Sequence, residues 1–185
     1  MIIPVLSVIL GIALLLILYT VAAYNGLVRG RNMVDEAWSG VDVQLKRRHD
    51  LIPSIVNTVK GYATHERETL EAVINARAAA MGSSGVEKAS ESEGELSHAL
   101  KRLMAISERY PDLKANQNFL QLQEQLTTLE DEIQMSRRYY NGQAREQNNR
   151  VLMFPRNIIA GMFGFTKVPF FTANETDRAV PEVKF

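Results

Sequence analysis

Apolar side chains follow three patterns along this chain: an unbroken run, a set of helical stripes and a final aromatic-rich segment. Residues 2–24 contain no charged side chain. A helix over that stretch would be about 34 Å long, enough to cross a hydrocarbon core of roughly 30 Å. Residues 1–24 are therefore predicted to form a transmembrane anchor. The alternative is a cleaved signal peptide, but the run is long for an h-region and no Lys or Arg precedes it.

The chain after the anchor carries apolar residues at helical spacing. A first helix is predicted from about Tyr24 to about Arg48, with a stripe whose spacings of 4, 3 and 4 residues keep it on one face. Its members are Val34, Trp38, Val41 and Leu45. Asp50 and Pro53 predict a turn, because Asp can cap the next helix and Pro fits its first turn. The alternative is one kinked, continuous helix through Pro53.

Composition changes mark the ends of the next two predicted helices. The second helix is expected to end near Gly82. Residues 82–94 are rich in Gly, Ser and Glu, which is typical of a solvated loop. The third helix is predicted over residues 95–109. Pro111 ends it, because proline disfavours helix in the residue before it.

The fourth predicted helix has the longest regular stripe. Its positions alternate spacings of 3 and 4 through three heptads, which is the pattern of a packed helical seam. They are Phe119, Leu122, Leu126, Leu129, Ile133, Ser136 and Tyr140. The preferred interpretation is a core within one chain, and the alternative is a coiled coil between chains. The sequence thus predicts an all-α fold: an N-terminal transmembrane helix followed by an antiparallel up-and-down four-helix bundle over residues 25–154.

Residues 155–185 are predicted to form an apolar C-terminal segment and, from Thr172, a loose polar tail. Between residues 154 and 171 only Arg156 and Lys167 are charged. Such a segment needs cover, from the open end of the bundle, the membrane interface or another subunit. The candidate contacts with a partner or with lipid are Phe154, Phe163, Phe165, Phe170 and Phe171.

The pattern YNGxxRxxN occurs twice, at residues 24–32 and at residues 140–148. In an up-and-down bundle, both copies would lie side by side next to the bilayer. We therefore predict a membrane-proximal polar contact or subunit contact there. Its candidate residues are Tyr24, Asn25, Asn32, Tyr140, Asn141 and Asn148. The competing explanation is that the asparagines set interhelical register.

Charge indicates a topology but no particular partner. The chain has 21 basic and 21 acidic residues, so no basic excess suggests nucleic acid. Arg29 and Arg31 follow the anchor at once, and the basic cluster 46–48 comes soon after. The positive-inside rule then places the N-terminus outside and the bundle in the cytoplasm. We interpret the cluster 46–48 as a solvated helix end, with a protein or lipid contact as the alternative.

Candidate chemistry is sparse. The chain has no cysteine, three histidines (His49, His65 and His98), no HExxH motif and no GxSxG motif. Each histidine is expected to be solvated or structural. No catalytic residue, metal ligand, cofactor or enzymatic activity is predicted.

Several longer strings together resemble the LemA family of bacterial membrane-associated proteins. They are YNGLVRGRN (24–32), EAWSGVDVQLKRRHDLIP (36–53), VKGYATHE (59–66), YPDLKANQNFLQLQ (110–123) and FPRN…FGF…FF (154–171). The resemblance implies an N-terminal membrane helix and a helical bundle, without an established enzymatic activity or cofactor. Some members are linked to membrane organisation, including magnetosome formation, and the family's genes often stand near membrane proteases. Members usually carry an aromatic residue where this chain has Gln147.

Two functions are compatible with these features. The first is a non-enzymatic, membrane-anchored bundle that self-assembles and acts as a scaffold or adaptor at the bacterial inner membrane. The alternative is a peptide- or protein-binding sensor or substrate adaptor associated with a membrane protease. The partners expected are the membrane and further copies of this chain, with a membrane protein as a further candidate. An uncharacterised hydrolase would require titratable groups that converge in one pocket.

Overall fold

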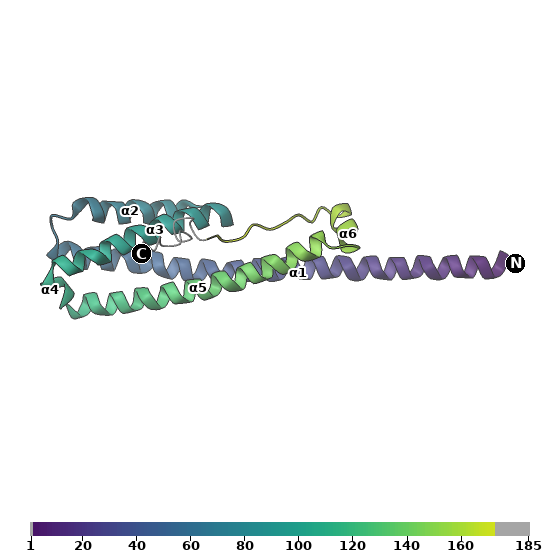
Figure 1. The fold of residues 1–185 in the computed structure, drawn as a ribbon, viewed down its shortest axis with the longest axis horizontal. Helices are drawn as coiled ribbons and strands as arrows, with labels where there is room; N and C mark the ends of the chain where they lie inside the picture. Colours follow the sequence, from purple (N-terminus) through teal and green to yellow (C-terminus); the bar gives the residue numbers. More distant parts are fainter. Residues whose placement is uncertain (1, 173–185) are drawn as a thin grey trace, which may run out of the picture. The chain divides into compact units, whose positions relative to one another are not determined.

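The structure is a computed structural model and describes residues 2–172. Within that range all regular structure is helical, which confirms the all-α prediction (Figure 1). The helices are α1 (Ile2–Tyr62), α2 (Arg67–Gly82), α3 (Val86–Ile106), the 3-10 helix η1 (Ser107–Arg109), α4 (Pro111–Lys114), α5 (Gln117–Leu152) and α6 (Arg156–Met162). The tail predicted from Thr172 lies outside the described residues, apart from Thr172 itself.

The chain forms two compact units. Among the described residues, the first comprises residues 2–38 and Tyr140–Val168, and the second comprises Ser39–Tyr139 and residues 169–172. Helices α1 and α5 each contribute residues to both units.

Helix α1 continues through Pro53, so the predicted turn at Asp50–Pro53 was wrong and the continuous alternative is correct. Proline has no N–H to offer the carbonyl four residues earlier, which belongs to His49. Arg77 of α2 supplies the missing donor: its Nε lies 2.7 Å from the His49 carbonyl oxygen. Ile52 and Ile55 on either side of Pro53 are fully buried, so core packing also holds the helix together there. The chain turns instead after Tyr62, before α2 begins at Arg67.

The predicted loop over residues 82–94 was also wrong, because α3 begins at Val86. Composition misled the prediction, since this stretch has few apolar residues. Its buried positions include Ser90 and Glu93, whose polar atoms find partners inside the protein. Buried polar side chains that have hydrogen-bond partners therefore hold this part of α3 in place, where apolar contacts are few. The break at Tyr110–Pro111 is confirmed, with Pro111 starting the short helix α4.

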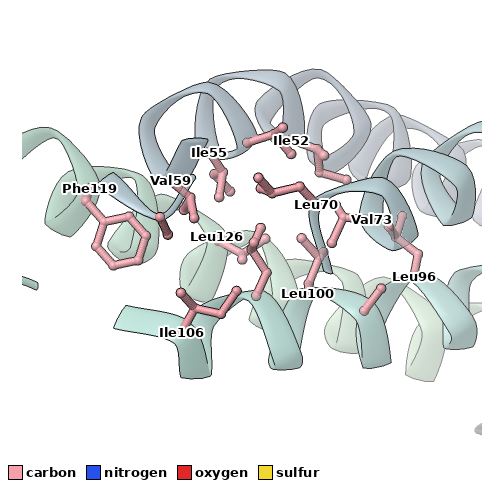
Figure 2. Packing of buried hydrophobic residues seen from close by; sticks show 14 of the residues in the cluster. Ile52, Ile55, Val59, Leu70, Val73, Leu96, Leu100, Ile106, Phe119 and Leu126 are labelled. Atoms are coloured by element: carbon pink, nitrogen blue, oxygen red, sulfur yellow. The ribbon is translucent and has the colours of Figure 1, made fainter. Parts of the chain in front are cut away.

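The second unit contains an apolar core cluster to which α1, α2, α3 and α5 all contribute (Figure 2). Ile55, Val73, Leu103 and Phe119 represent these four helices, and each is at most 1% exposed. Asn116 precedes α5 and accepts a hydrogen bond from the Phe119 N–H through its Oδ1, at 2.9 Å. The α5 stripe points into the chain, as the core interpretation predicted. Its buried members are Phe119, Leu126, Leu129, Ile133 and Tyr140.

The first unit has a much smaller core. Ala23 and Leu27 of α1 pack with Val151 of α5 and with Ile159 and Ala160 of α6. The N-terminal part of α1 is different: its apolar side chains are exposed from Ile3 to Val21. By length and composition α1 includes a segment that could cross a membrane, and none of that segment is buried in the protein.

Candidate functional site

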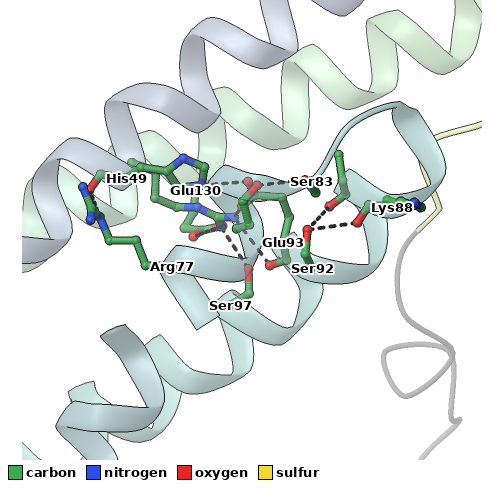
Figure 3. A network of polar contacts seen from close by, with 11 residues as sticks. His49, Arg77, Ser83, Lys88, Ser92, Glu93, Ser97 and Glu130 are labelled. Carbon is green, nitrogen blue, oxygen red and sulfur yellow. Dashed lines mark hydrogen bonds and ion pairs between the residues drawn. The ribbon is translucent and has the colours of Figure 1, made fainter. Parts of the chain in front are cut away.

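A buried ionic cluster lies in the second unit, on one turn of α1 and the facing turns of α3 and α5. Arg48 is 1% exposed although it is a charged side chain. Its guanidinium forms ion pairs with Glu93 of α3 and, at 2.5 Å, with Glu130 of α5 (Figure 3). Arg48 Nη1 also donates to the Ser97 hydroxyl at 2.9 Å. Two carboxylates therefore compensate one buried cation, as a buried charge requires.

His49 adds an imidazole to the cluster. Its Nε2 lies 2.7 Å from Glu93 Oε1. Burial favours the neutral form of Glu93, but the His49 hydrogen bond and the Arg48 charge together outweigh it and hold the pKa of this carboxyl below its ordinary value. Glu93 is therefore ionised at neutral pH. Because an ionised carboxylate only accepts, His49 Nε2 carries the hydrogen in this contact.

A cavity of about 500 Å³ adjoins the cluster. Its walls come from α1, α3, α5 and the extended residues 171–172. Phe171 lies beneath the guanidinium of Arg137, 4.6 Å from its carbon to the ring centroid. The Ser90 hydroxyl donates to the Thr172 carbonyl oxygen at 2.5 Å. The cavity is thus lined by ionic and hydroxyl groups together with an aromatic ring.

Sequence reasoning missed this cluster, although a signal for it exists. Arg48 was interpreted as part of a solvated helix end, and Glu93 was assigned to a loop. However, Arg48 continues the stripe of Val41 and Leu45 at a spacing of 3 residues. Glu93 falls in the matching stripe of α3, four residues after Ala89 and three before Leu96. Opposite charges at two core positions predict a buried pair. Among the described residues, no group of three or more His, Asp or Glu side chains could hold a metal ion.

The repeated motif contributes unequally to the first unit. In the first copy, Asn25 and Asn32 are exposed. The Tyr24 ring contacts Phe163 in a tilted arrangement and Phe165 edge-on, with ring centroids 4.8 and 5.9 Å apart. In the second copy, Tyr140 is buried against Trp38 of α1. Burial and the negative charge of Asp35 raise the pKa of Tyr140 to about 12, so its hydroxyl stays neutral.

Asn148 and Gln147 hold the end of α5 to its neighbours. The Asn148 amide accepts from the Val168 N–H at 2.8 Å and donates to the Val168 carbonyl at 3.0 Å. Asn141 of the same copy is partly buried. Gln147 is 3% exposed and donates to the Leu27 carbonyl at 3.2 Å. Its Oε1 packs against Gly30, where a Cβ would collide with it.

The five phenylalanines proposed as partner or lipid contacts also divide. Phe171 is 3% exposed, and Phe165 packs on the small core of the first unit. Phe154, Phe163 and Phe170 keep exposed fractions of 79%, 53% and 41%. The exposed members are therefore the ones that a membrane or a partner can reach.

Known proteins are similar to this chain over nearly its whole length. It is similar to Protein LemA of Metamycoplasma hominis, with 30% identity over 83% of this chain and 71% of that protein. It is similar to Magnetosome protein MamQ 2 of Paramagnetospirillum magneticum, with 26% identity over 99% of this chain and 76% of that protein. Magnetosome protein MamQ of Magnetospirillum gryphiswaldense is 30% identical over 49% of this chain and 35% of its own length. Residues 37–185 match the sequence profile of the LemA family, and the chain belongs to that family.

Proposed function

We propose that this protein is a non-enzymatic, membrane-anchored helical scaffold or adaptor of the bacterial inner membrane. One observation carries the proposal: α1 changes from exposed apolar side chains before Ala23 to buried ones after it. Exposed side chains from Ile3 to Val21 cannot be stable in water and need a lipid environment. The later part of the same helix contributes Ile52, Ile55 and Val59 to the apolar core of the second unit.

The orientation follows from the charges that flank the anchor. Arg29 and Arg31 are exposed and stand directly after it. The positive-inside rule places such residues on the cytoplasmic side, with the N-terminus outside. The bundle is then a cytoplasmic platform tied to the membrane by one helix.

Self-assembly is supported by an exposed apolar patch in the second unit, on Val43 of α1 and Met135 and Tyr139 of α5. These side chains are 54%, 54% and 55% exposed. Arg47 pairs with Glu132 at 2.6 Å, which brings the two helices together one turn from Val43 and from Met135. Exposed apolar side chains beside an ion pair form a surface that a second copy can cover.

The mass of the intact protein in detergent tests self-assembly. We expect light scattering, with the detergent contribution subtracted, to give a discrete multiple of 20.8 kDa. Met135→Glu should reduce that mass towards one chain, because it buries a charge in the contact. Met81→Glu, at an equally exposed methionine of α2, should leave the mass unchanged. A monomeric wild-type protein would disprove self-assembly and leave only the adaptor function.

The cavity beside Arg48 favours a second candidate, a peptide- or protein-binding adaptor for a membrane protease. Its volume of about 500 Å³ lies within the range of ligand sites. A photo-crosslinking residue at Gln134, which borders the cavity, should then capture a recurring peptide in cells. The same residue at exposed Gln121 of α5 serves as the control. Equal products at both positions would argue against a ligand in this cavity.

A further inference from the structure

Helix α6 and its flanks have one packed face and one exposed apolar face. Ile159 and Ala160 are buried against the small core of the first unit. Ile158 and Met162 stand four residues apart on the other face and are 54% and 71% exposed. Phe154 before the helix and Phe163 after it are exposed as well. The surface is too apolar to be explained as an ordinary solvated helix.

The packing of α6 places this surface at the end of the proposed membrane span. Its buried face meets α1 at Ala23 and Leu27, directly after the exposed apolar stretch 3–22. That stretch would be about 30 Å long as a helix, which matches the hydrocarbon core. The contact points therefore fall where acyl chains give way to lipid headgroups. Tyr24 contacts Phe163 there, and tyrosine rings prefer this depth.

Charge around α6 favours a phosphate-rich surface. No Asp or Glu occurs between residues 147 and 172, whereas Arg150, Arg156 and Lys167 do. Arg156 and Lys167 are exposed. The chain as a whole is neutral, so this is a local excess of positive charge. Basic residues beside an apolar helix face are typical of segments that lie on an anionic membrane.

We propose that α6 with its flanking residues 152–154 is a second membrane contact, lying flat in the leaflet from which α1 emerges. Phe154, Ile158 and Met162 insert at the boundary between acyl chains and headgroups, and Arg156 and Lys167 bind lipid phosphates. The inference rests on the membrane span of the proposed function. A second copy of α6 fits this face less well, because a two-fold contact would bring the basic residues of both copies together without a carboxylate between them.

The test uses the full chain in vesicles that contain anionic and zwitterionic lipids. The protein has no cysteine, so single cysteines at Ile158 and Met162 can each carry an environment-sensitive fluorophore. Met81→Cys provides a matched methionine in the second unit, and Leu14→Cys reports on the span. Quenchers attached at shallow and deep positions of the lipid, and one dissolved in water, measure the depth of each label.

We expect the labels at Ile158 and Met162 to be quenched several-fold more by shallow lipid quenchers than the label at Met81, and less by the aqueous quencher. The double variant Arg156→Glu, Lys167→Glu should reduce this lipid quenching in anionic vesicles. Aqueous quenching at Met162 equal to that at Met81, with Leu14 still in lipid, would overturn the inference and leave the anchor intact. Protection of Met162 from every quencher would show a protein cover and also overturn it. Aqueous quenching at Leu14 would instead disprove the anchor itself.

Discussion

The two units of this protein treat their apolar residues in opposite ways. In the second unit, sixteen buried residues from Ile52 to Leu126 form one apolar cluster, and a charged cluster is also buried. The first unit buries five residues in its small core and leaves the long apolar stretch at the start of α1 and one apolar face of α6 exposed. The same hydrophobic effect acts on both units. The second unit satisfies it with contacts inside the protein. The first unit needs its surroundings to cover its exposed apolar side chains.

The largest difference between the two units is expected when a buried and an exposed phenylalanine are each replaced by alanine. Phe119 is 1% exposed, whereas Phe154 is 79% exposed. Phe119→Ala should lower the free energy of unfolding by about 4 kcal/mol, because it leaves a cavity in the core. Phe154→Ala should change it by less than about 0.5 kcal/mol. Helical circular dichroism during denaturation in detergent measures both, and similar losses would contradict the division into two kinds of region.

The ionic cluster offers the next largest effect. Glu93→Gln removes one of the two carboxylates that compensate buried Arg48, and should cost about 3 kcal/mol, since Glu130 remains. Glu132→Gln, in the exposed pair with Arg47, should cost at most about 1 kcal/mol. The same denaturation experiment compares them. Equal costs would mean that the cluster is as solvated as the surface pair.

The pH dependence sharpens this prediction. The pKa of Glu93 is lowered in the folded protein from an ordinary value of 4.5, so its stabilising effect is complete above about pH 4.5. As the pH falls below that value and through the lowered folded pKa, the carboxyl becomes protonated and the effect is lost. The stability difference between wild type and Glu93→Gln should therefore shrink in acid. A difference that stays constant down to about pH 3 would show that the charge of Glu93 is not what stabilises the fold.

A smaller effect is expected where α2 supports α1 at Pro53. Arg77→Met leaves the His49 carbonyl without its donor and should cost about 1 to 2 kcal/mol. Pro53→Ala restores a backbone N–H for that carbonyl. In the Pro53→Ala background, Arg77→Met should then cost clearly less. A double-mutant cycle measures the coupling, and additive costs would show that Arg77 acts elsewhere.

The smallest prediction concerns the close approach of α5 to α1 in the first unit. A Cβ at Gly26 meets nothing within 4 Å, whereas a Cβ at Gly30 meets the side chains of Gln147 and Arg150. Gly26→Ala should stabilise the protein by about 0.5 to 1 kcal/mol, because alanine favours helix. Gly30→Ala should lose that gain, because buried Gln147 has to move. Thermal unfolding of the two variants side by side would contradict the proposed contact if both were equally stabilised.

Local sequence information predicted the end of α2, the stripe of α5 and the break at Pro111 correctly, and it failed at two places for related reasons. It indicated the α5 stripe and the break at Pro111 because those signals depend on neighbours in sequence. It placed a turn at Pro53 and a loop before residue 95 because it could not include partners from elsewhere in the chain. Arg77 stands 24 positions beyond Pro53, and Arg48 stands 45 positions before Glu93. The candidate site was missed with them, since the buried pair joins the stripe of one helix to the stretch assigned to a loop.

The sequence by itself determined that the chain is helical, that residues 2–24 form a span without charge, and that it resembles the LemA family. These features can be read from the spacing and composition of residues within single segments, because the geometry of the helix relates spacing directly to structure. Only the tertiary structure decided which polar residues are buried, which phenylalanines remain exposed and where α1 ends. Burial of a charge depends on a compensating charge brought from a distant helix, and exposure of a ring depends on what packs over it. Neither can be inferred from the spacing within one segment.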